Sequence, residues 1–401
     1  MDGDGGVVGE SPKRGRLVLP SLVVTRFALG APSLLISLLL IEIGATFGQS
    51  VGAAGQLSTV SSVAAFIAAL LMGFLSLRFR PRSLLLVGMS LFALSAVGCA
   101  FSPHFSLMVA FYAMGGIGAS MVIPMTTTMV GELYPLSERA TAIGYLLAGG
   151  ALSFVIGAPS IILIAGYGGW RAAFLGFVLP FVLLGTLLSY LGLPSKPSEE
   201  AAATEGGGFI EGFRDILMNR SAVSCLIGSA LNAACWQAVV FYSASLMRQR
   251  FQVSTGFAAI YIIGGALAYT VGSLVSGRFV NRFGRKRVTV ITSVLAGAFT
   301  LIYYNVLDIW ASIFLAYVAS LFTGVRSSSS SSLTMEQVPS YRGTMMSISS
   351  AIDNMGVALG AGLGGLMLLW YDYNVLGVVL GGAGMAASLL FHLLTREPTQ
   401  K

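Results

Sequence analysis

Long apolar runs separated by short polar loops constrain this chain more than any other feature. The sequence can be divided into about twelve runs of the ~20 mostly apolar residues that a membrane-spanning helix needs. Such runs must form helices, because hydrocarbon offers the backbone no hydrogen-bond partner. Hydrophobic residues make up 55% of the chain and charged residues 10%, which is outside the range of soluble proteins. We therefore expect an all-α integral membrane protein with twelve transmembrane helices.

The chain also contains an internal repeat. The basic stretch 277–287, Gly-Arg-Phe-Val-Asn-Arg-Phe-Gly-Arg-Lys-Arg, lies between two apolar runs and has a counterpart at 73–82. Gly277 and Gly73 are 277 − 73 = 204 residues apart, and Glu336 and Glu132 keep the same offset, 336 − 132 = 204. Features of such different chemistry would not keep one register by chance. The register predicts two related six-helix bundles in tandem.

Changes in composition suggest five parts. We expect a cytoplasmic tail at 1–23, an N-terminal bundle at 24–193, a cytoplasmic linker at 194–221, a C-terminal bundle at 222–395 and a cytoplasmic tail at 396–401. The linker begins with a Pro-, Glu- and Gly-rich stretch typical of flexible connections. Apolar residues then recur at helical spacing from Phe209 to Leu217, which predicts an amphipathic helix on the inner membrane surface.

Basic residues indicate the orientation. Lys and Arg are retained on the cytoplasmic side during insertion, and most of them, including Arg26 at the expected start of the first helix, fall at one side. The expected outer segments hold only Arg171, Arg248 and Arg250. Both termini are therefore expected in the cytoplasm, and the protein in the plasma membrane. Because the net charge of +7 resides in these loops, we expect the lipid bilayer, not nucleic acid, as the partner.

The sequence contains no pattern typical of an enzyme. Cys99, Cys225 and Cys235 lie in or beside apolar runs without the spacing of metal ligands, which favours a packing role. His104 and His392 are expected at opposite faces of the membrane. We expect no cofactor, no metal and no enzymatic activity. A primary pump would need a nucleotide-binding domain, and no phosphate-binding loop stands out.

Three charged residues fall inside apolar runs. Arg326 lies ten residues before Glu336, and Asp353 lies eleven after Arg342, so both are expected ~15 Å from the inner surface. Charge at this depth is costly and usually faces the protein interior. One hypothesis is that Arg326 binds substrate while Asp353 or Glu42 takes up protons. The alternative is a static ion pair between Arg326 and Asp353, with Glu42 at the wet outer boundary.

Two acidic residues end apolar runs on the inner side. Glu132 and Glu336 are related by the repeat, which predicts that they lie near Arg78 and Arg282. We interpret these groups as two charge clusters that hold the cytoplasmic side shut in one state of the molecule. The alternative is that they are ordinary charges at the membrane boundary.

The stretch 277–287 resembles the basic inter-helix motif of the major facilitator superfamily, found between helices 2 and 3 and between helices 8 and 9. Residues 156–159, Ile-Gly-Ala-Pro, resemble the helix 5 motif of proton-coupled efflux members. Residues 168–171 and 341–346 resemble the drug and sugar (arabinose-type) efflux permease branch. In this chain Leu77 stands where the family usually has Asp, and Tyr112 stands where many proton antiporters have Arg.

The resemblance implies roles for further residues. The expected cytoplasmic gate comprises Gly73, Arg78, Glu132, Arg139, Gly277, Asn281, Arg282, Gly284, Arg285, Glu336 and Arg342. The helix 5 motif comprises Gly149, Gly150, Gly157 and Pro159. In this fold, helices 1, 4, 7 and 10 line a central cavity between the halves. Besides Arg326, the candidate substrate contacts there are Tyr112, Met121, Met125, Asn232, Trp236, Gln237 and Tyr242, with plain helix packing as the alternative for each.

The expected function is secondary active transport of a small organic solute by alternating access. The first hypothesis is proton-coupled efflux of drug-like, sugar or organic-anion compounds, carried out by a monomer. An uptake symporter or a uniporter on the same fold is the first alternative. A membrane sensor or partner-binding subunit that transports nothing is the second.

Overall fold

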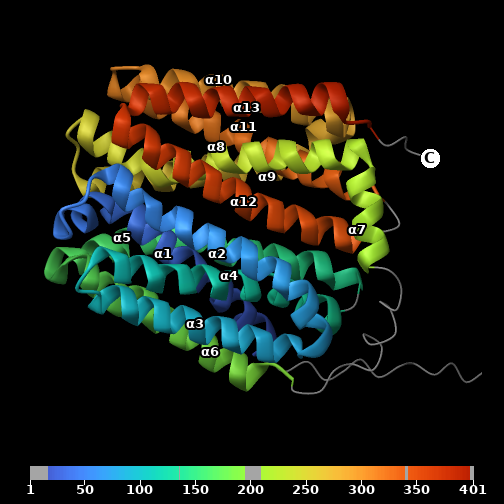
Figure 1. The fold of residues 1–401 in the computed structure, drawn as a ribbon, viewed down its shortest axis with the longest axis horizontal. Coiled ribbons are helices and arrows are strands. Elements are labelled where there is room, and N and C mark those ends of the chain that lie inside the picture. Colours follow the sequence, from blue (N-terminus) through green and yellow to red (C-terminus); the bar gives the residue numbers. More distant parts are fainter. Residues whose placement is uncertain (1–16, 135, 195–208, 339–341, 398–401) are drawn as a thin grey trace, which may run out of the picture.

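The structure, a computed structural model, describes residues 17–134, 136–194, 209–338 and 342–397 (Figure 1). The remaining parts of the expected tails and linker lie outside these ranges. The expected gate roles of Gly73, Arg139 and Arg342 concern side-chain surroundings that also fall outside the description, although the backbones belong to helices. Within the described ranges, the regular elements are all helices.

Thirteen α-helices and one short π-helical turn make up the described fold. The first half contains α1 (Val18–Thr46), α2 (Val51–Arg78), α3 (Pro81–Phe101), α4 (Phe105–Leu133), α5 (Leu136–Ala173), η1 (Phe174–Val178) and α6 (Leu179–Gly192). The connecting helix is α7 (Phe209–Met218). The second half contains α8 (Arg220–Arg250), α9 (Thr255–Phe283), α10 (Arg285–Asn305), α11 (Ile309–Met335), α12 (Arg342–Trp370) and α13 (Tyr373–Leu394).

The described helices provide twelve membrane crossings. Eleven segments are long and apolar enough to span a bilayer, and one of them, Gly144–Gly192, is 49 residues long. This segment is two crossings, because the helical backbone is broken at Gly168 and Gly169, where φ is −138° and 70°. Glycine tolerates a positive φ that other residues avoid, so the chain can turn sharply there. The prediction of twelve transmembrane helices is confirmed.

The repeat seen in the sequence is also present in the helix boundaries. Helices α2, α3 and α4 start at 51, 81 and 105, and α9, α10 and α11 start at 255, 285 and 309, an offset of 204 for each pair. The two halves lie side by side in Figure 1, blue to green and yellow to red. The prediction of two pseudo-symmetric six-helix bundles is confirmed.

Helices α2 and α12 form a close seam between the halves. A Cβ placed on Gly52 would lie 2.5 Å from the Gly365 carbonyl oxygen, and one on Gly365 would lie 2.6 Å from that of Gly52. The two backbones therefore touch, an approach that only small residues permit between membrane helices. Helix α1 also packs against α8, and α5 against α9.

Helix α1 begins earlier than the sequence suggested. We expected it to start at residue 24, with Arg26 as a boundary charge, whereas it starts at Val18. Arg26 is therefore inside the helix, where its guanidinium donates to the Ile123 carbonyl (3.2 Å) and the Thr127 hydroxyl (3.1 Å) of α4. These hydrogen bonds are the physical reason that a charge can lie two turns inside the bundle.

The amphipathic helix α7 lies across one end of the bundle, on the side where the C-terminal end also lies (Figure 1). Ile216 is fully buried with Ala222 of α8 and Met345 of α12, while Leu217 and Met218 are exposed. One apolar side is thus anchored to the protein and the other remains free. We call this end of the bundle the α7 face, and the other end the opposite face.

Candidate functional site

The candidate site is centred on Arg326 of α11. Its side chain is buried, with 7% of the residue exposed, and lies nine residues before the end of α11, or ~14 Å inside the bundle. The side chains of Cys235, Tyr269 and Asp353 lie near the guanidinium. The site therefore draws on α8, α9, α11 and α12, all from the second half.

Arg326 and Asp353 are neighbours without direct contact. Each charge acts on the other, yet no nitrogen of Arg326 lies within 4.0 Å of an Asp353 oxygen, and both residues belong to the described part. Asp353 faces α8, because Gly356, one turn further along α12, touches the Ala230 carbonyl oxygen. The locked ion pair considered as an alternative is absent from this state, so both groups are available for other partners.

Helix geometry places Asn232 of α8 at the level of Arg326. The hydroxyls of Ser229 and Ser330 join α8 to α11 at 3.2 Å. Asn232 is three residues after Ser229, and Arg326 is four before Ser330, so both lie one turn further from the α7 face, on the surfaces that meet. Asn232 is 3% exposed, and its amide nitrogen is buried without a hydrogen-bond partner.

An aromatic pair adjoins these polar groups. The rings of Trp236 (α8) and Tyr269 (α9) are stacked, with centroids 4.9 Å apart and an interplanar angle of 21°. Trp236 is one turn after Asn232 on α8, and Tyr269 is one of the groups that act on Arg326. Both side chains are half-buried. Trp236 was expected from the sequence, whereas Tyr269 was missed because nothing in its local sequence distinguishes it.

Glu42, expected as a proton site, is engaged across the two halves. Its carboxylate accepts two hydrogen bonds from Arg248 of α8, at 2.7 and 2.8 Å, and Arg248 also donates to the Leu38 carbonyl. The Glu42 side chain is 37% exposed and the Arg248 side chain 17%. This bidentate pair joins α1 to α8 near the opposite face. A role in proton uptake remains a prediction, and would require this pair to open.

Other polar contacts join the halves in the same region. The Ser37 hydroxyl donates to the Val240 carbonyl at 2.8 Å, and the Gln56 amide donates to the Gly362 carbonyl at 3.3 Å. Tyr242, a candidate substrate contact, is fully buried beside Gly55 of α2 and donates to the Ala361 carbonyl. Where both partners are described, the hydrogen bonds and the ion pair between the halves all lie toward the opposite face.

At the α7 face, Glu336 forms an ion pair with Arg285, another member of the expected gate, at 3.4 Å. Arg285 begins α10, three residues after Arg282, and the expected position of Glu336 near Arg282 stays a prediction. In the first half, no described residue forms an ion pair with Glu132. The related charges therefore occupy related positions without forming related contacts. Asn281 and Gly277 lie in the last turns of α9, where Gly277 has open space around its Cα.

Gly284 occupies the junction of α9 and α10 with φ at 86°, a conformation that side chains other than glycine rarely adopt. Directly beside it, a carboxylate oxygen of Glu397 accepts from the Lys286 backbone N–H at 3.4 Å. Arg396 joins the same region, because its carbonyl accepts from the Gln337 amide at 3.1 Å. The C-terminal segment is thus held against the basic loop of the second half.

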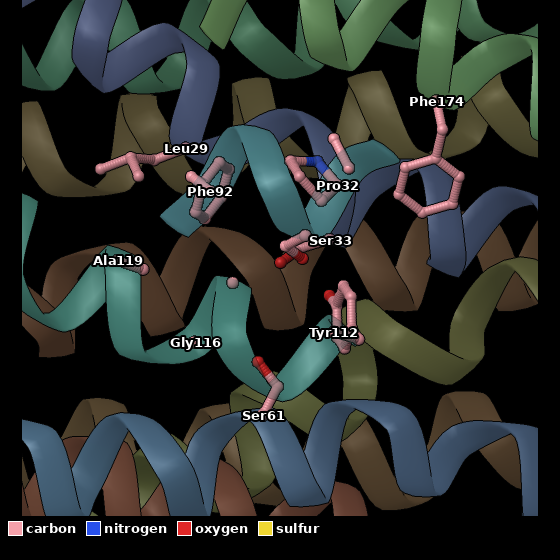
Figure 2. A pocket seen from close by; sticks show the side chains of 12 residues that line it. Leu29, Pro32, Ser33, Ser61, Phe92, Tyr112, Gly116, Ala119 and Phe174 are labelled. Atoms are coloured by element: carbon pink, nitrogen blue, oxygen red, sulfur yellow. The ribbon is translucent and has the colours of Figure 1, made fainter. Parts of the chain in front are cut away.

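The α4 candidates lie in the first half. Met121 and Met125 are buried within its core, a placement that favours helix packing. Tyr112 borders a small cavity of about 70 Å³ between α1, α2, α3 and α4. Figure 2 shows Ser33 and Ser61 at this cavity with Tyr112. Gln237 of α8 is half-buried, and Asn281 of α9 lies at the α7 face.

The helix 5 motif packs α5 against α1. A Cβ on Gly149 would lie 2.7 Å from the Val23 carbonyl oxygen, and one on Gly157 would lie 3.1 Å from Leu34. Gly150 has open space, and Pro159 lies inside α5. In this state the motif is therefore a packing surface within the first half.

A family model described as "Major Facilitator Superfamily" matches residues 21–269 and 249–401. The gentisate transporter of Corynebacterium glutamicum is 24% identical over 85% of this chain and 79% of its own length. A probable sugar efflux transporter of Helicobacter acinonychis is 24% identical over 89% and 90%. The multidrug resistance protein 2 of Bacillus subtilis is 24% identical over 74% of each.

Solved structures show the same fold. A D-xylose-proton symporter superposes with a TM-score of 0.76 at 19% identity, covering 96% of this chain and 99% of the other. An inward-facing bacterial homologue of the human lysosomal transporter Spinster gives 0.72 at 16% identity, with 94% and 95% covered. The family match extends over both halves and the fold agrees throughout. The chain is therefore a multi-pass membrane transporter, not an enzyme, and it belongs to the Major Facilitator Superfamily.

Proposed function

We propose that this protein is a proton-coupled secondary transporter of a small organic solute, with Asp353 as the proton site. The observation that carries the proposal is the unpaired state of Asp353 and Arg326 inside the bundle. Charges at this depth are costly, and intramembrane carboxylates near a cavity are typical of proton relays. A carboxylate free of an ion pair can gain and lose a proton without breaking the fold.

Alternating access is supported by the distribution of contacts between the halves. The basic loops lie on the α7 face, which by the positive-inside rule is the cytoplasmic side. The contacts between α1 and α8, from Ser37 to Arg248, then close the outer side, and this state faces the cytoplasm. Breaking the Glu42–Arg248 pair and rocking the halves would open the outer side. Both termini would be cytoplasmic in a plasma membrane, and one chain contains the complete path, so it would function as a monomer.

Export is the direction that we propose first. The helix 5 motif at 156–159 supports it, as do the relatives named for sugar efflux and multidrug resistance. In an antiport cycle, proton uptake by Asp353 on the outer side would accompany release of the solute. The names of the relatives differ in substrate, and so they do not define one for this chain.

Uptake by symport is the second candidate, supported by the position of Asp353 next to Arg326. Protonation of Asp353 would leave the Arg326 cation without its nearest carboxylate. Arg326 would then bind an anionic solute more strongly, and proton and solute would travel together. The arrangement can therefore operate in either direction, depending on whether the solute requires Arg326.

The test uses purified protein in liposomes that contain a pH-sensitive dye. An imposed proton gradient is challenged with sugars, amphiphilic drugs and organic anions, for wild type, Asp353→Asn and Asp353→Glu. We expect a solute-triggered proton flux that Asp353→Asn abolishes and Asp353→Glu retains. Flux that continues unchanged in Asp353→Asn would remove Asp353 from coupling. Labelled solute that moves without protons would show a uniporter instead.

A further inference from the structure

Two polar groups of the site, Arg326 and Asn232, offer hydrogen-bond donors. The guanidinium has only donors, and the amide nitrogen of Asn232, which helix geometry places at the level of Arg326, is a buried donor without a partner. A buried donor left unsatisfied costs free energy, and a buried cation without a counter-ion costs more. The side of the site formed by α8 and α11 is therefore complementary to a ligand that accepts hydrogen bonds and carries negative charge.

A carboxylate fits this complementarity better than a neutral or cationic group. Two carboxylate oxygens match the forked donors of a guanidinium, and this charge-assisted contact is among the stronger hydrogen bonds in proteins. A cationic ligand would be repelled by Arg326. A neutral acceptor such as a sugar hydroxyl would leave the cation uncompensated.

The adjacent aromatic pair indicates the shape of the ligand body. Trp236 and Tyr269 are already stacked at 4.9 Å, both are half-buried, and Trp236 lies one turn from Asn232. Each ring has one face in the stack. Flat apolar groups are favoured where they can extend such a pair.

We propose that the second half binds a planar organic carboxylate: Arg326 and Asn232 hold the carboxylate, and the Trp236–Tyr269 stack covers the flat body. This substrate class rests on the proposed transport function, but the site itself requires neither a direction nor a proton. All of its members come from the second half. The ligand would therefore remain on one bundle while the halves rock about it.

Asp353 gives the proposal a further consequence. The Asp353 carboxylate lies near Arg326 without forming an ion pair with it. Its negative charge repels an incoming carboxylate and also weakens the attraction of that carboxylate to the guanidinium. Replacing it with the neutral, nearly isosteric asparagine removes both effects. Asp353→Asn should therefore bind a carboxylate more tightly, about threefold or more, even though it no longer couples protons.

The experiment measures binding in detergent, with no gradient, by calorimetry on the full chain. Benzoate is compared with benzamide, which has the same ring and no charge, and with acetate, which has the charge and no ring. We expect wild type to bind benzoate at least about tenfold more tightly than either comparator. Arg326→Gln should remove the preference of benzoate over benzamide, and Trp236→Ala should reduce the preference over acetate.

Arg26→Gln is the matched control. Arg26 is also an arginine inside the bundle, but it is bonded to α4 in the first half. This variant should keep the preference for benzoate. Thermal unfolding of each variant in detergent, together with acetate and benzamide binding, shows whether a loss of benzoate binding comes from misfolding.

Several outcomes would overturn the proposal. These are equal binding of benzoate and benzamide by wild type, a preference that survives Arg326→Gln, loss of the preference in folded Arg26→Gln, or no saturable benzoate binding at millimolar concentration. Failure of the transport proposal gives a different result. In that case benzoate binds as expected while proteoliposomes show no coupled proton flux.

Discussion

The two halves share one helix register but distribute their intramembrane charges differently. In the first half, Arg26 is held by two hydrogen bonds to α4. In the second half, Arg326 and Asp353 lie at comparable depth near each other, and within the described residues neither belongs to an ion pair. The first half bonds its intramembrane cation to a neighbouring helix, while the charged groups of the second half form no ion pair with a described residue.

The contrast is reversed at the α7 face. Glu336 pairs with Arg285, and the C-terminal residues Arg396 and Glu397 are bonded to the same region. Glu132 in the first half has no ion pair with a described residue. The two bundles therefore share the course of the backbone, while their side-chain contacts differ. The second half has the candidate site and an inner end with more polar contacts among the described residues.

The largest expected effect separates the two buried arginines. Arg326→Gln should lower the initial rate of solute transport about a hundredfold, because a charge-assisted contact with substrate is lost at a desolvated position. Arg26→Gln should lower it by no more than a few-fold. Transport of labelled solute into or out of proteoliposomes measures both. Equal losses in two folded variants would mean that the first half also contacts substrate, and the contrast between the charged groups of the two halves would fail.

The next largest effect concerns the pair that joins the halves. Glu42→Gln should shift the molecule toward the state open at the opposite face by about tenfold, since a bidentate ion pair across the seam is lost. Spin labels at Gln49 and Leu307, exposed positions in different halves, would report a longer distance in a cysteine-free background.

The exchange Glu42→Arg with Arg248→Glu provides the control for this prediction. It recreates the pair with its charges reversed and should restore the shorter distance. If Glu42→Gln leaves the distance distribution of the wild type unchanged, the pair does not hold the seam closed.

The smallest effect compares the two inner glutamates. Glu336→Gln should lower stability by about 0.5 kcal/mol, because its pair with Arg285 is partly exposed and such pairs contribute little. Glu132→Gln should leave stability unchanged or raise it slightly. Thermal unfolding in detergent distinguishes the two. A larger loss for Glu132→Gln would contradict the asymmetry between the inner ends.

Much of the candidate site could be selected from the sequence, for a physical reason. A charged residue in a long apolar run is rare enough to notice, which is how Arg326, Asp353 and Glu42 were identified. Arg26 was misplaced because it follows the first apolar residues so closely that it resembled a boundary charge. Tyr269 and Arg248 could not be assigned, since an aromatic residue in a membrane helix and a basic residue at a helix end are both ordinary.

By itself, the sequence determined the membrane class, the twelve crossings, the tandem halves and the superfamily, because these depend on local hydropathy and on a repeat visible along the chain. Only the tertiary structure decided which charges meet. Glu42 and Arg248 are 248 − 42 = 206 residues apart and come together through packing of the halves. Arg326 gains Cys235, Tyr269 and Asp353 as neighbours through packing of four helices. Contacts of this kind depend on helix rotation and depth, which residue order alone does not specify.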